Sequence, residues 1–241
     1  MVGELMKRFE ITAVLTGRVK PLGKRHSPSG IDKSPVQGPL AFGDFGLLGD
    51  EQGDLRLHGG GEKAIHHYPF DHYKFWADVL LKEGCDYCGP SFKEAGAFGE
   101  NLSTIGLTEK EVCLGDIFQL GTGVVQISQG RQPCWKLNER FGVSSMARQV
   151  QETGRTGWYY RVLEDGLVGT GDCLCLKERL APEWTLGRVT NLLYVDVKNF
   201  TALNELLGLP FLAPNWRALA ERRLAKGDVE DWRPRLDGPQ I

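Results

Sequence analysis

Short segments in which apolar and polar residues alternate make up most of the first three quarters of the chain. The first runs from Phe9 to Leu15. Others cover residues 45–48, 63–68, 117–120, 124–128, 158–163, 167–168 and 172–177. A period of two is typical of strands with one buried face, and Asp165-Gly166 is a hairpin turn signal between two of them. The pattern predicts a mainly β fold with helices, closed or nearly closed as a β-barrel.

Helical spacing of apolar residues occurs at two places within this β-rich part. Residues 69–81 carry an apolar stripe formed by Phe70, Tyr73, Trp76, Ala77, Leu80 and Leu81. Pro69 suits the first turn of a helix, and Gly84 is placed to end it. We expect such an aromatic stripe to face the core. Residues 144–152 are a second, shorter helix candidate.

The composition changes at Ala181-Pro182, after which three helical segments follow. They cover residues 186–195, 202–207 and 214–226, and a glycine is placed to end each of the last two. We therefore predict a β-barrel domain over residues 1–181 and a small three-helix domain with a tail over residues 182–241. The tail from residue 228 is expected to be less ordered.

Charge and composition exclude some classes of partner. The chain has 241 residues and a formal net charge of −2, which gives no global attraction to nucleic acid or to an anionic membrane. Any anionic ligand must then be held by a local site. Residues 1–10 lack an apolar signal core, which favours a cytoplasmic protein with reduced cysteines. Cys85 and Cys88 form a lone Cys-x-x-Cys pair, a weak metal signal without a second pair.

The stretch from Gly130 to Gly142 carries the clearest candidate chemistry. Pro133 fixes its own φ and stiffens the turn that presents Cys134. Arg131 and Lys136 lie close in sequence and could stabilise a thiolate, the form that attacks substrates or binds metals. The alternative is a buried structural cysteine in a loop, which is the commoner role.

A second candidate stretch, from His58 to Pro69, holds three of the five histidines and begins with three consecutive glycines. Residues 63–68 are predicted as a strand, in which Lys63 and His67 share one face and His66 lies on the other. A histidine near a thiol can act as a proton donor or thiolate partner. A metal site is also open, although the spacing matches no standard zinc signature, and so is a polar loop with two half-buried imidazoles.

Two further features bear on the site. Asn101, which follows Gly99-Glu100, either hydrogen-bonds a ligand or caps a turn. Residues 17–53 are rich in Gly, Pro, Ser and Lys and are interpreted as loop with short strands at most. Lysines such as Lys33 make this loop locally basic. Usually such a loop is merely solvated, and the less common alternative is that it covers an anionic ligand.

Taken together, these motifs resemble the MOSC family, named for the C-terminal domain of molybdenum cofactor sulfurase. The resemblance covers most of the chain and is carried by His58-Gly59-Gly60, Lys63-Ala64, His66, Gly99-Glu100-Asn101-Leu102, Gly115-Asp116, Arg131-x-Pro-Cys134 and Gly171-Asp172. It is closest to the YiiM-like branch of 6-N-hydroxylaminopurine resistance proteins, which adds a C-terminal three-helix (3-alpha) domain. Gly130 departs from that branch, where proline is common.

The resemblance implies a β-barrel that binds the molybdenum cofactor, a molybdopterin with a phosphate tail. It makes Cys134 the protein ligand to molybdenum. Lys63, Asn101 and Arg131 would hold the pterin and its phosphate, and His66 would be a proton donor or hydrogen-bond partner near the metal. The cofactor pocket would also be lined by His58, Gly59 and Gly60.

The YiiM-like branch is associated with reduction of N-hydroxylated compounds, including 6-N-hydroxylaminopurine. The net step converts R-NHOH, two electrons and two protons into R-NH2 and water, with Cys134, His66 and Lys63 as the catalytic residues. Molybdenum can deliver the two electrons, while the protein supplies protons and a shaped pocket. The sequence shows no flavin or nicotinamide fingerprint, so a separate flavoprotein reductase is the implied donor. The three-helix domain is a candidate surface for docking it.

Two other functions remain open at the level of sequence. The same site could carry the cofactor, or handle sulfur through a persulfide on Cys134, without redox turnover. Alternatively, the protein is a partner-binding module whose functional part is the three-helix domain. These motifs specify neither the physiological substrate nor the oligomeric state, for which a homodimer is one option.

Overall fold

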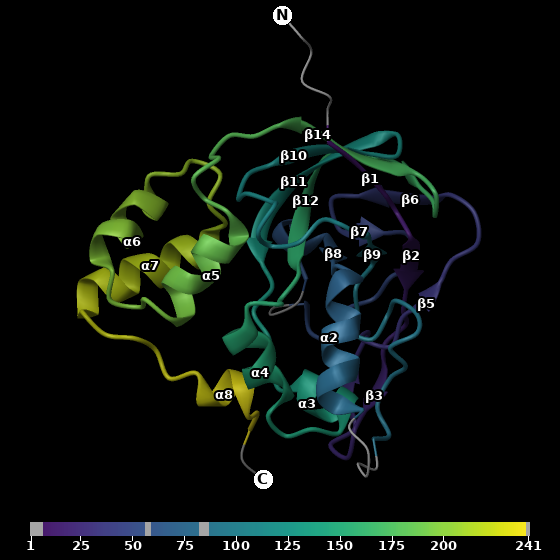
Figure 1. The fold of residues 1–241 in the computed structure, drawn as a ribbon, viewed down its shortest axis with the longest axis horizontal. Helices are drawn as coiled ribbons and strands as arrows, with labels where there is room; N and C mark the ends of the chain where they lie inside the picture. The colour runs from purple at the N-terminus through teal and green to yellow at the C-terminus, as the bar shows by residue number, and fades with distance from the viewer. Residues whose placement is uncertain (1–6, 56–58, 82–86, 240–241) are drawn as a thin grey trace, which may run out of the picture.

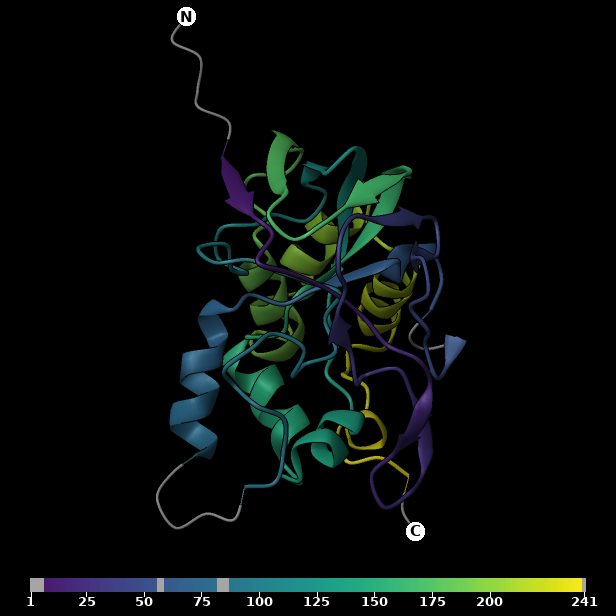
Figure 2. The same ribbon diagram turned by 90° about the vertical axis from the view of Figure 1, so that its right-hand side faces the viewer.

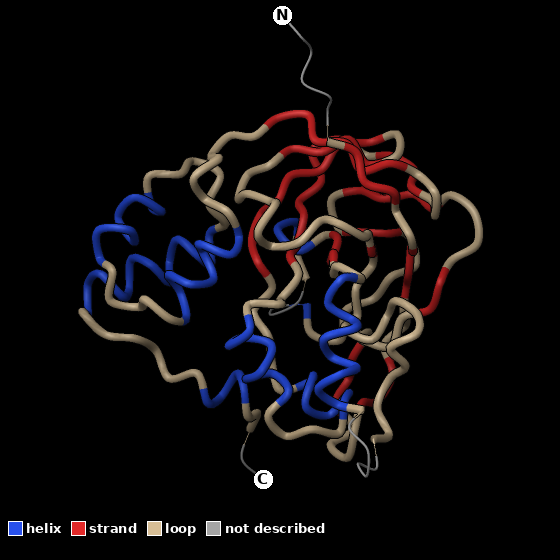
Figure 3. Tube along the Cα trace, viewed as in Figure 1, coloured by secondary structure: helices blue, strands red, loops and turns tan. Residues whose placement is uncertain are grey.

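The computed structural model describes residues 7–55, 59–81 and 87–239. Its strands are β1 (Arg8–Glu10), β2 (Ala13–Thr16), β3 (Lys20–Leu22), β4 (Ser27–Ser29), β5 (Ser34–Pro35), β6 (Leu40–Gly43), β7 (Gly46–Leu47), β8 (Ile65–His67), β9 (Leu102–Ser103), β10 (Ile117–Leu120), β11 (Gly123–Gly130), β12 (Trp158–Glu164), β13 (Gly166–Val168) and β14 (Cys173–Glu178). Its helices are η1 (Gly61–Lys63), α2 (Asp71–Leu80), α3 (Lys136–Phe141), α4 (Met146–Thr153), α5 (Leu186–Tyr194), α6 (Phe200–Leu207), α7 (Pro214–Lys226) and α8 (Arg233–Leu236). In the view of Figures 1 and 3, α2, α3, α4 and α8 lie below most of the strands, and α5, α6 and α7 lie to one side.

One large curled sheet contains most of the strands, in the order β1-β14-β10-β11-β12-β8-β9-β2-β5. β1 lies at one end of this sheet, whereas β2, the next strand along the chain, lies near the other end. In the link between them, the N–H of Ile11 donates to the carbonyl of Asp172 at 2.8 Å, and the N–H of Thr12 donates to the carbonyl of Ser103 at 2.9 Å. This link brings the two ends of the sheet together. The sheet is therefore a curled half-barrel, which confirms the predicted mainly β fold with helices.

The predicted strand from Phe9 to Leu15 is instead two strands, β1 and β2, which lie toward opposite ends of the large sheet. Two further details of the predicted strands are wrong. Asp165-Gly166 does not join a hairpin, because β12 stays in the large sheet while β13 pairs with β6 in a separate three-stranded sheet. Residues 63–68 are not one strand, because Lys63 closes the 3-10 helix η1 and only Ile65–His67 is extended as β8. Both differences arise from pairing with distant segments, which alternation along the chain does not encode.

An apolar core fills the half-barrel and continues under the C-terminal helices. The side chains of Ile65, Ile127 and Trp158 are fully buried inside the sheet. Leu193 of α5 and Trp216 of α7 belong to the same cluster of buried side chains. The sheet and the C-terminal helices thus share one core.

The three predicted C-terminal helices are confirmed, and local capping explains their ends. The side chains of Thr185 and Asn199 each accept a backbone N–H from the first turn of the helix that follows. Pro214 occupies the first turn of α7, and Gly227 ends that helix with a φ of 65°. None of the helices in the described part of the chain combines the length and the apolar character needed to cross a membrane.

A second apolar cluster lies between α2, α3 and α4. It includes Trp76 of α2, Phe98 and Phe141, all of them buried, so the aromatic stripe of α2 faces a core as predicted. Figure 2 shows α2 standing beside α3 and α4. Helix α3 lies outside the predicted elements, because it is only six residues long and its apolar spacing is too brief to detect.

The expectation of a less ordered tail is wrong for residues 228–239, and residues 240–241 lie outside the described residues. After α7 the chain continues to α8, and Leu236 of α8 is only 1% exposed because it packs into the second cluster. Burial of one leucine side chain contributes about 2 kcal/mol relative to leaving it in water, which favours a docked tail. The segment around α8 is therefore part of the packed structure.

Candidate functional site

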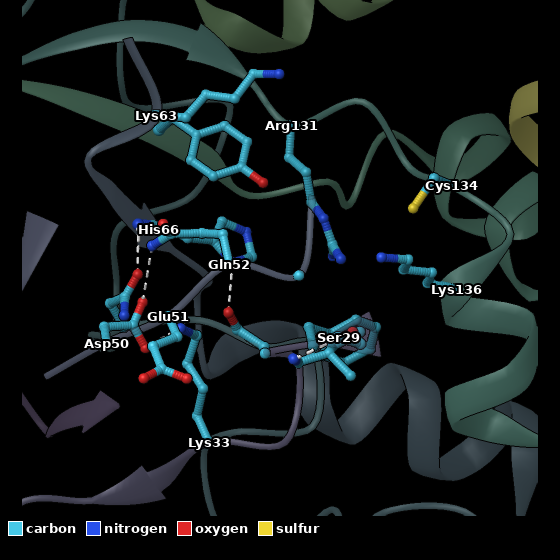
Figure 4. A pocket seen from close by; sticks show the side chains of 17 residues that line it. Ser29, Lys33, Asp50, Glu51, Gln52, Lys63, His66, Arg131, Cys134 and Lys136 are labelled. Carbon is cyan, nitrogen blue, oxygen red and sulfur yellow. Dashed lines mark hydrogen bonds and ion pairs between the residues drawn. The ribbon is translucent and has the colours of Figure 1, made fainter. Parts of the chain in front are cut away.

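Most of the predicted site residues meet in one pocket, although they come from distant parts of the chain (Figure 4). The pocket has about 580 Å³ of free space, including its mouth. Its lining includes Lys63, His66, Asn101, Arg131 and Cys134. They belong to η1, β8, the loop before β9 and the turn after β11. Residues 29–33 and 50–53 supply a further wall.

Two residues that were predicted to line the pocket lie next to it instead. Within the described residues, Gly59 and Gly60 lie at the start of η1 and are not part of the lining. Gly60 has a φ of 91°, a conformation that glycine adopts without strain, and its carbonyl accepts the N–H of Lys63 at 2.9 Å. These glycines shape the turn that carries Lys63. His58, and Cys85 of the Cys-x-x-Cys pair, lie outside the described residues.

Lys63 and His66 line the same pocket, although strict alternation would put them on opposite faces. The 3-10 turn of η1 breaks the alternation and turns Lys63 to the His66 side. Burial lowers the pKa of Lys63, while the charges of Cys134 and Asp54 act in the opposite direction. The ammonium group is therefore electrostatically coupled to the thiol.

Cys134 lies in the turn that connects β11 to α3. At the start of this turn the N–H of Arg131 donates to the carbonyl of Gly157 at 3.0 Å, and at its end the N–H of Leu137 donates to the carbonyl of Cys134 at 2.9 Å. The half-buried thiol points into the pocket, toward the charged ends of Arg131 and Lys136 (Figure 4). Neighbouring cations stabilise the thiolate, which is the form that binds metals.

His66 brings an unused hydrogen-bonding atom to the site. Its side chain is buried, and its Nδ1 lies 3.2 Å from the carbonyl oxygen of Gly99. Because a carbonyl only accepts, Nδ1 carries the hydrogen and Nε2 is left as an acceptor; Nε2 is buried with no partner in the described part of the chain. Burial, and then the positive charge of Arg131, hold the pKa of His66 well below its ordinary value. The imidazole is therefore neutral near pH 7.

Asn101 holds the pocket wall together. Its Oδ1 accepts the backbone N–H of His66 at 3.0 Å, and its Nδ2 donates to the carbonyl of Leu15 at 3.1 Å. The preceding Glu100 is fully buried, and its carboxylate accepts two backbone N–H groups of the same loop. The motif therefore ties β8 to β2 and fixes the Gly99 carbonyl that orients the ring of His66.

The lining carries an excess of positive charge. Arg131 is 8% exposed, and its Nη1 is buried without a partner among the described residues. Lys136 donates to the carbonyl of Pro28 at 2.8 Å. Lys33 is compensated, because it forms a buried ion pair with Asp50. Arginine and lysine side chains in such a site suit an anionic ligand, for example a phosphate.

The wall formed by residues 29–33 and 50–53 was not among the predicted parts of the site. These residues belong to the loop that was expected to be solvated. Arg140 of α3 forms an ion pair with Asp32 at 2.8 Å, and Glu51 pairs with Arg18 at 2.6 Å on the outer side. The lysines of the loop were the available signal, since Lys33 reaches the pocket. The alternative in which the loop covers a ligand site agrees better with this position.

Tyr159 is a pocket residue that was not among the predicted site residues. It lies on β12 opposite His66, and the two rings are 5.0 Å apart between centroids. Burial raises the pKa of Tyr159, and the charge of Arg131 acts in the opposite direction. Its phenol group is therefore neutral and close to Arg131. Only the pairing of β8 with β12, which the sequence does not state, brings this ring to the pocket.

The donor set limits what the pocket can bind. Within residues 7–55, 59–81 and 87–239, no three His, Cys, Asp or Glu side chains come together to hold a metal ion. The pocket instead presents the thiol of Cys134, the neutral acceptor of His66 and several cations. These features suit a pocket for an anionic ligand, with a thiol that is able to ligate a metal or to react.

Comparison with known proteins identifies the family. The family model of the MOSC domain matches residues 54–174, and that of the YiiM-like, 3-alpha helix domain matches residues 184–227. The chain is 40% identical over 215 residues to the uncharacterized protein YflK of Bacillus subtilis, covering 88% of this chain and 93% of that protein. It is 37% identical over 227 residues to protein YiiM of Escherichia coli, covering 93% and 97%.

Structural similarity agrees with these matches. The crystal structure of YiiM from Escherichia coli has a TM-score of 0.77 and 32% identity, covering 95% of this chain and 98% of that one. A Gibberella moniliformis protein named "Reductase" is 37% identical over 200 residues, a match that spans 82% of this chain but 34% of that protein. The chain therefore belongs to the MOSC-domain family and carries the C-terminal helical domain of its YiiM-like members. MOSC domains are associated in general with binding of the molybdenum cofactor.

Proposed function

We propose that the protein is a molybdenum-cofactor-dependent reductase of N-hydroxylated compounds such as 6-N-hydroxylaminopurine. The net reaction takes R-NHOH, two electrons and two protons to R-NH2 and water. Cys134 is the protein ligand to molybdenum in this proposal. The electrons come from a separate flavoprotein reductase.

The observation that carries the proposal is the meeting of Cys134, Arg131 and His66 in one pocket of a MOSC-family chain. Two buried polar atoms there, Arg131 Nη1 and His66 Nε2, have no partner among the described residues. Buried polar atoms left unpaired carry a free-energy cost of about 1–3 kcal/mol each. A ligand that accepts from the guanidinium and donates to the imidazole would remove this cost, which supports a resident cofactor.

The lining residues fit the charge and donor requirements of molybdopterin. Lys63, Arg131 and Lys136 would bind the phosphate and pterin through charge-assisted hydrogen bonds. Cys134 would provide a thiolate, which is a strong donor to a metal centre. Asn101, whose amide is engaged by backbone groups, would act by holding the wall against the pterin. When bound, the cofactor supplies a metal centre that transfers two electrons.

The chain's own residues would bind, orient and protonate the substrate. The lowered pKa of Lys63 means that its ammonium group releases a proton more readily than an exposed lysine does. His66 begins as a neutral acceptor at Nε2, and a bound anion would favour its protonated form. Lys63 and His66 are therefore the two candidate sources for the two protons of the reaction.

The fungal relative supports a partnership with a second redox component. That protein is named "Reductase" and is about three times as long as its matched part, so a MOSC-like unit there is joined to further sequence. Such a fusion is expected when two redox components pass electrons from one to the other. In this proposal, the second component is a separate flavoprotein reductase.

The test is anaerobic reduction of 6-N-hydroxylaminopurine by cofactor-loaded protein with a chemical electron donor. We expect the wild type to form the amine and Cys134→Ser to lose about 100-fold in rate, because a metal ligand is removed. Cys88→Ser removes an exposed thiol that is not part of the pocket lining and is the matched control, expected to keep full activity. Thermal unfolding of all three proteins should be alike.

Two results would contradict the proposal. If Cys134→Ser turned over substrate as fast as the wild type, Cys134 would not be needed for the reaction. Full molybdenum loading with no reduction of any hydroxylamine would favour the cofactor-carrier function, and an extra sulfur atom on Cys134 in mass spectrometry would favour sulfur handling.

A further inference from the structure

The last residues of the chain are built into the turn that carries Cys134. We define the C-terminal strap as residues 228–239, which follow α7 and include α8. In Figure 1 the strap leaves the end of α7, crosses below α5 and reaches α4. It lies beyond both family-matched segments, which end at residues 174 and 227. Its contacts therefore lie outside the two segments that the family models match.

Arg235 of the strap binds the backbone on both sides of Cys134. Its Nη1 donates to the carbonyl of Pro133, and its own carbonyl accepts the N–H of Trp135 at 2.8 Å. Its Nη2 donates to Oε1 of Gln151 in α4 at 2.5 Å. The residues immediately before and after Cys134 are thus held by a single strap residue, which is itself anchored to a helix.

The residues that follow Arg235 keep it in place. The carbonyl of Leu236 accepts Nδ2 of Asn138 at 2.8 Å, and the side chain of Leu236 is buried in the second apolar cluster. Asp237 pairs with Arg148 of α4 at 3.3 Å. These contacts to α3 and α4 fix the strap on either side of the turn, so that Arg235 cannot move without breaking them.

Trp135 extends the same packing to the basic loop. The guanidinium carbon of Arg25 lies 5.1 Å from the centre of the Trp135 ring. On the strap side, a Cβ at Gly238 would lie 2.9 Å from the same ring, so the backbone packs directly against it. The turn, the strap and the loop that walls the pocket are therefore held together at one point.

We propose that Arg235 is a positioning residue for the thiol of Cys134, and that the C-terminal strap sets how far this thiol is exposed. Residues 131–135 form a turn without regular structure, and such segments open locally unless they are tied down. The Arg235 contacts tie down this turn at Pro133 and Trp135. The functional reason for holding the thiol rests on the proposed function, but the positioning itself does not depend on a cofactor.

The test is the alkylation rate of each cysteine by iodoacetamide, measured by mass spectrometry on full-length protein from cells that cannot make molybdopterin. Arg235→Ala is expected to accelerate alkylation of Cys134 about tenfold, a factor equivalent to about 1.4 kcal/mol. Cys113, which is fully buried in the core, should keep its wild-type rate. Arg235→Lys retains a donor for the Pro133 carbonyl and should bring the Cys134 rate back to within about threefold of wild type.

Arg233→Ala is the matched control on the same helix. Arg233 pairs with Asp231 of the strap at 2.7 Å, and its side chain is 79% exposed, so its removal should leave the Cys134 rate unchanged. If Arg235→Ala does not fold, Gln151→Ala removes only the anchor of the guanidinium and should give a smaller acceleration confined to Cys134.

Two outcomes would overturn the proposal. One is a wild-type Cys134 rate in folded Arg235→Ala protein. The other is equal acceleration at Cys134 and Cys113, because that result reports general destabilisation. The proposed function is tested by turnover of loaded protein, so its failure would not alter these rates, and an unchanged rate would not contradict the reductase.

Discussion

At the scale of single residues, the two neighbouring histidines of β8 lie in different environments. His66 faces the pocket, whereas His67 faces the interior and is fully buried. The two ring nitrogens of His67 lie 3.0 Å from the hydroxyl of Tyr160 and 2.9 Å from that of Thr104. The alternation of a strand predicts that the two rings point apart. It does not say which ring faces the pocket, because that depends on which face of the sheet is covered.

His67 is expected to make folding sensitive to acid. Burial lowers its pKa to about 3 from 6.5, so the unfolded chain binds a proton below pH 6.5 that the folded chain does not. Its contribution to stability is lost as the pH falls, by about 2 kcal/mol between about pH 7.5 and about pH 5. His67→Gln lacks this titration, so the difference in unfolding free energy between wild type and variant should shrink by that amount. Urea unfolding at several pH values measures it, and a constant difference would show that His67 is not the group responsible.

At the scale of elements, Gly157 joins the turn of Cys134 to the segment between β9 and β10. The N–H of Gly157 donates to Oε1 of Glu109 at 2.7 Å, and its carbonyl accepts the N–H of Arg131 at 3.0 Å. A Cβ at this position would lie 2.4 Å from the carbonyl oxygen of His67 and 3.2 Å from Nε2 of His66. The start of β12 therefore has to be a glycine for β8 and the Cys134 turn to approach as closely as they do.

Gly157→Ala should destabilise the protein far more than a similar change at a roomy glycine. Gly157 has a φ of 68° and Gly142, at the end of α3, has a φ of 67°, so both alanines incur about 1 kcal/mol of backbone strain. A Cβ at Gly142 meets no atom within 4 Å. We expect a loss of about 3 kcal/mol or more for Gly157→Ala and about 1 kcal/mol for Gly142→Ala in denaturant unfolding. Equal losses would mean that β8 and β12 move apart easily.

The elements found from the sequence are those with a long, regular pattern. Helices α5 and α7 and strands β10 to β12 lie close to their predicted ranges, because local periodicity and caps determine them. The loop of residues 29–33 could not be placed in this way. Its position depends on contacts across the chain, such as the ion pair of Lys33 with Asp50 and the hydrogen bond from the N–H of Gly17 to the Asp50 carboxylate at 2.8 Å. The Cys134 pocket was predicted from motif residues, but its second wall required the fold.

At the scale of the whole molecule, the sheet and the C-terminal helices are joined through one core. Trp216 of α7 is 2% exposed, and a Cβ at Gly130 would lie 3.3 Å from its ring. A larger residue at the end of β11 would therefore press on the ring of Trp216. Arg161 of β12 links the same regions, because it donates to the carbonyl of Phe211 at 2.8 Å and to Glu62 at 2.6 Å.

The shared core predicts that the chain unfolds as one cooperative unit. Trp216→Ala should lower the free energy of unfolding by about 3–5 kcal/mol. Calorimetry should show one transition in both proteins, shifted as a whole in the variant. Two separate transitions, with only the smaller one shifted, would show that the predicted domains over residues 1–181 and 182–241 fold independently. Composition predicted this division but carries no information on how much core the two parts share.

The most direct measurement on the central claim is X-ray absorption at the molybdenum edge, on wild-type protein loaded with cofactor and on Cys134→Ser. We predict that molybdenum in the wild type has one more sulfur neighbour than in the variant, and that Cys88→Ser gives the wild-type spectrum. Identical metal environments in wild type and Cys134→Ser would contradict it, because the thiol that points into the pocket would then have no part in binding the metal.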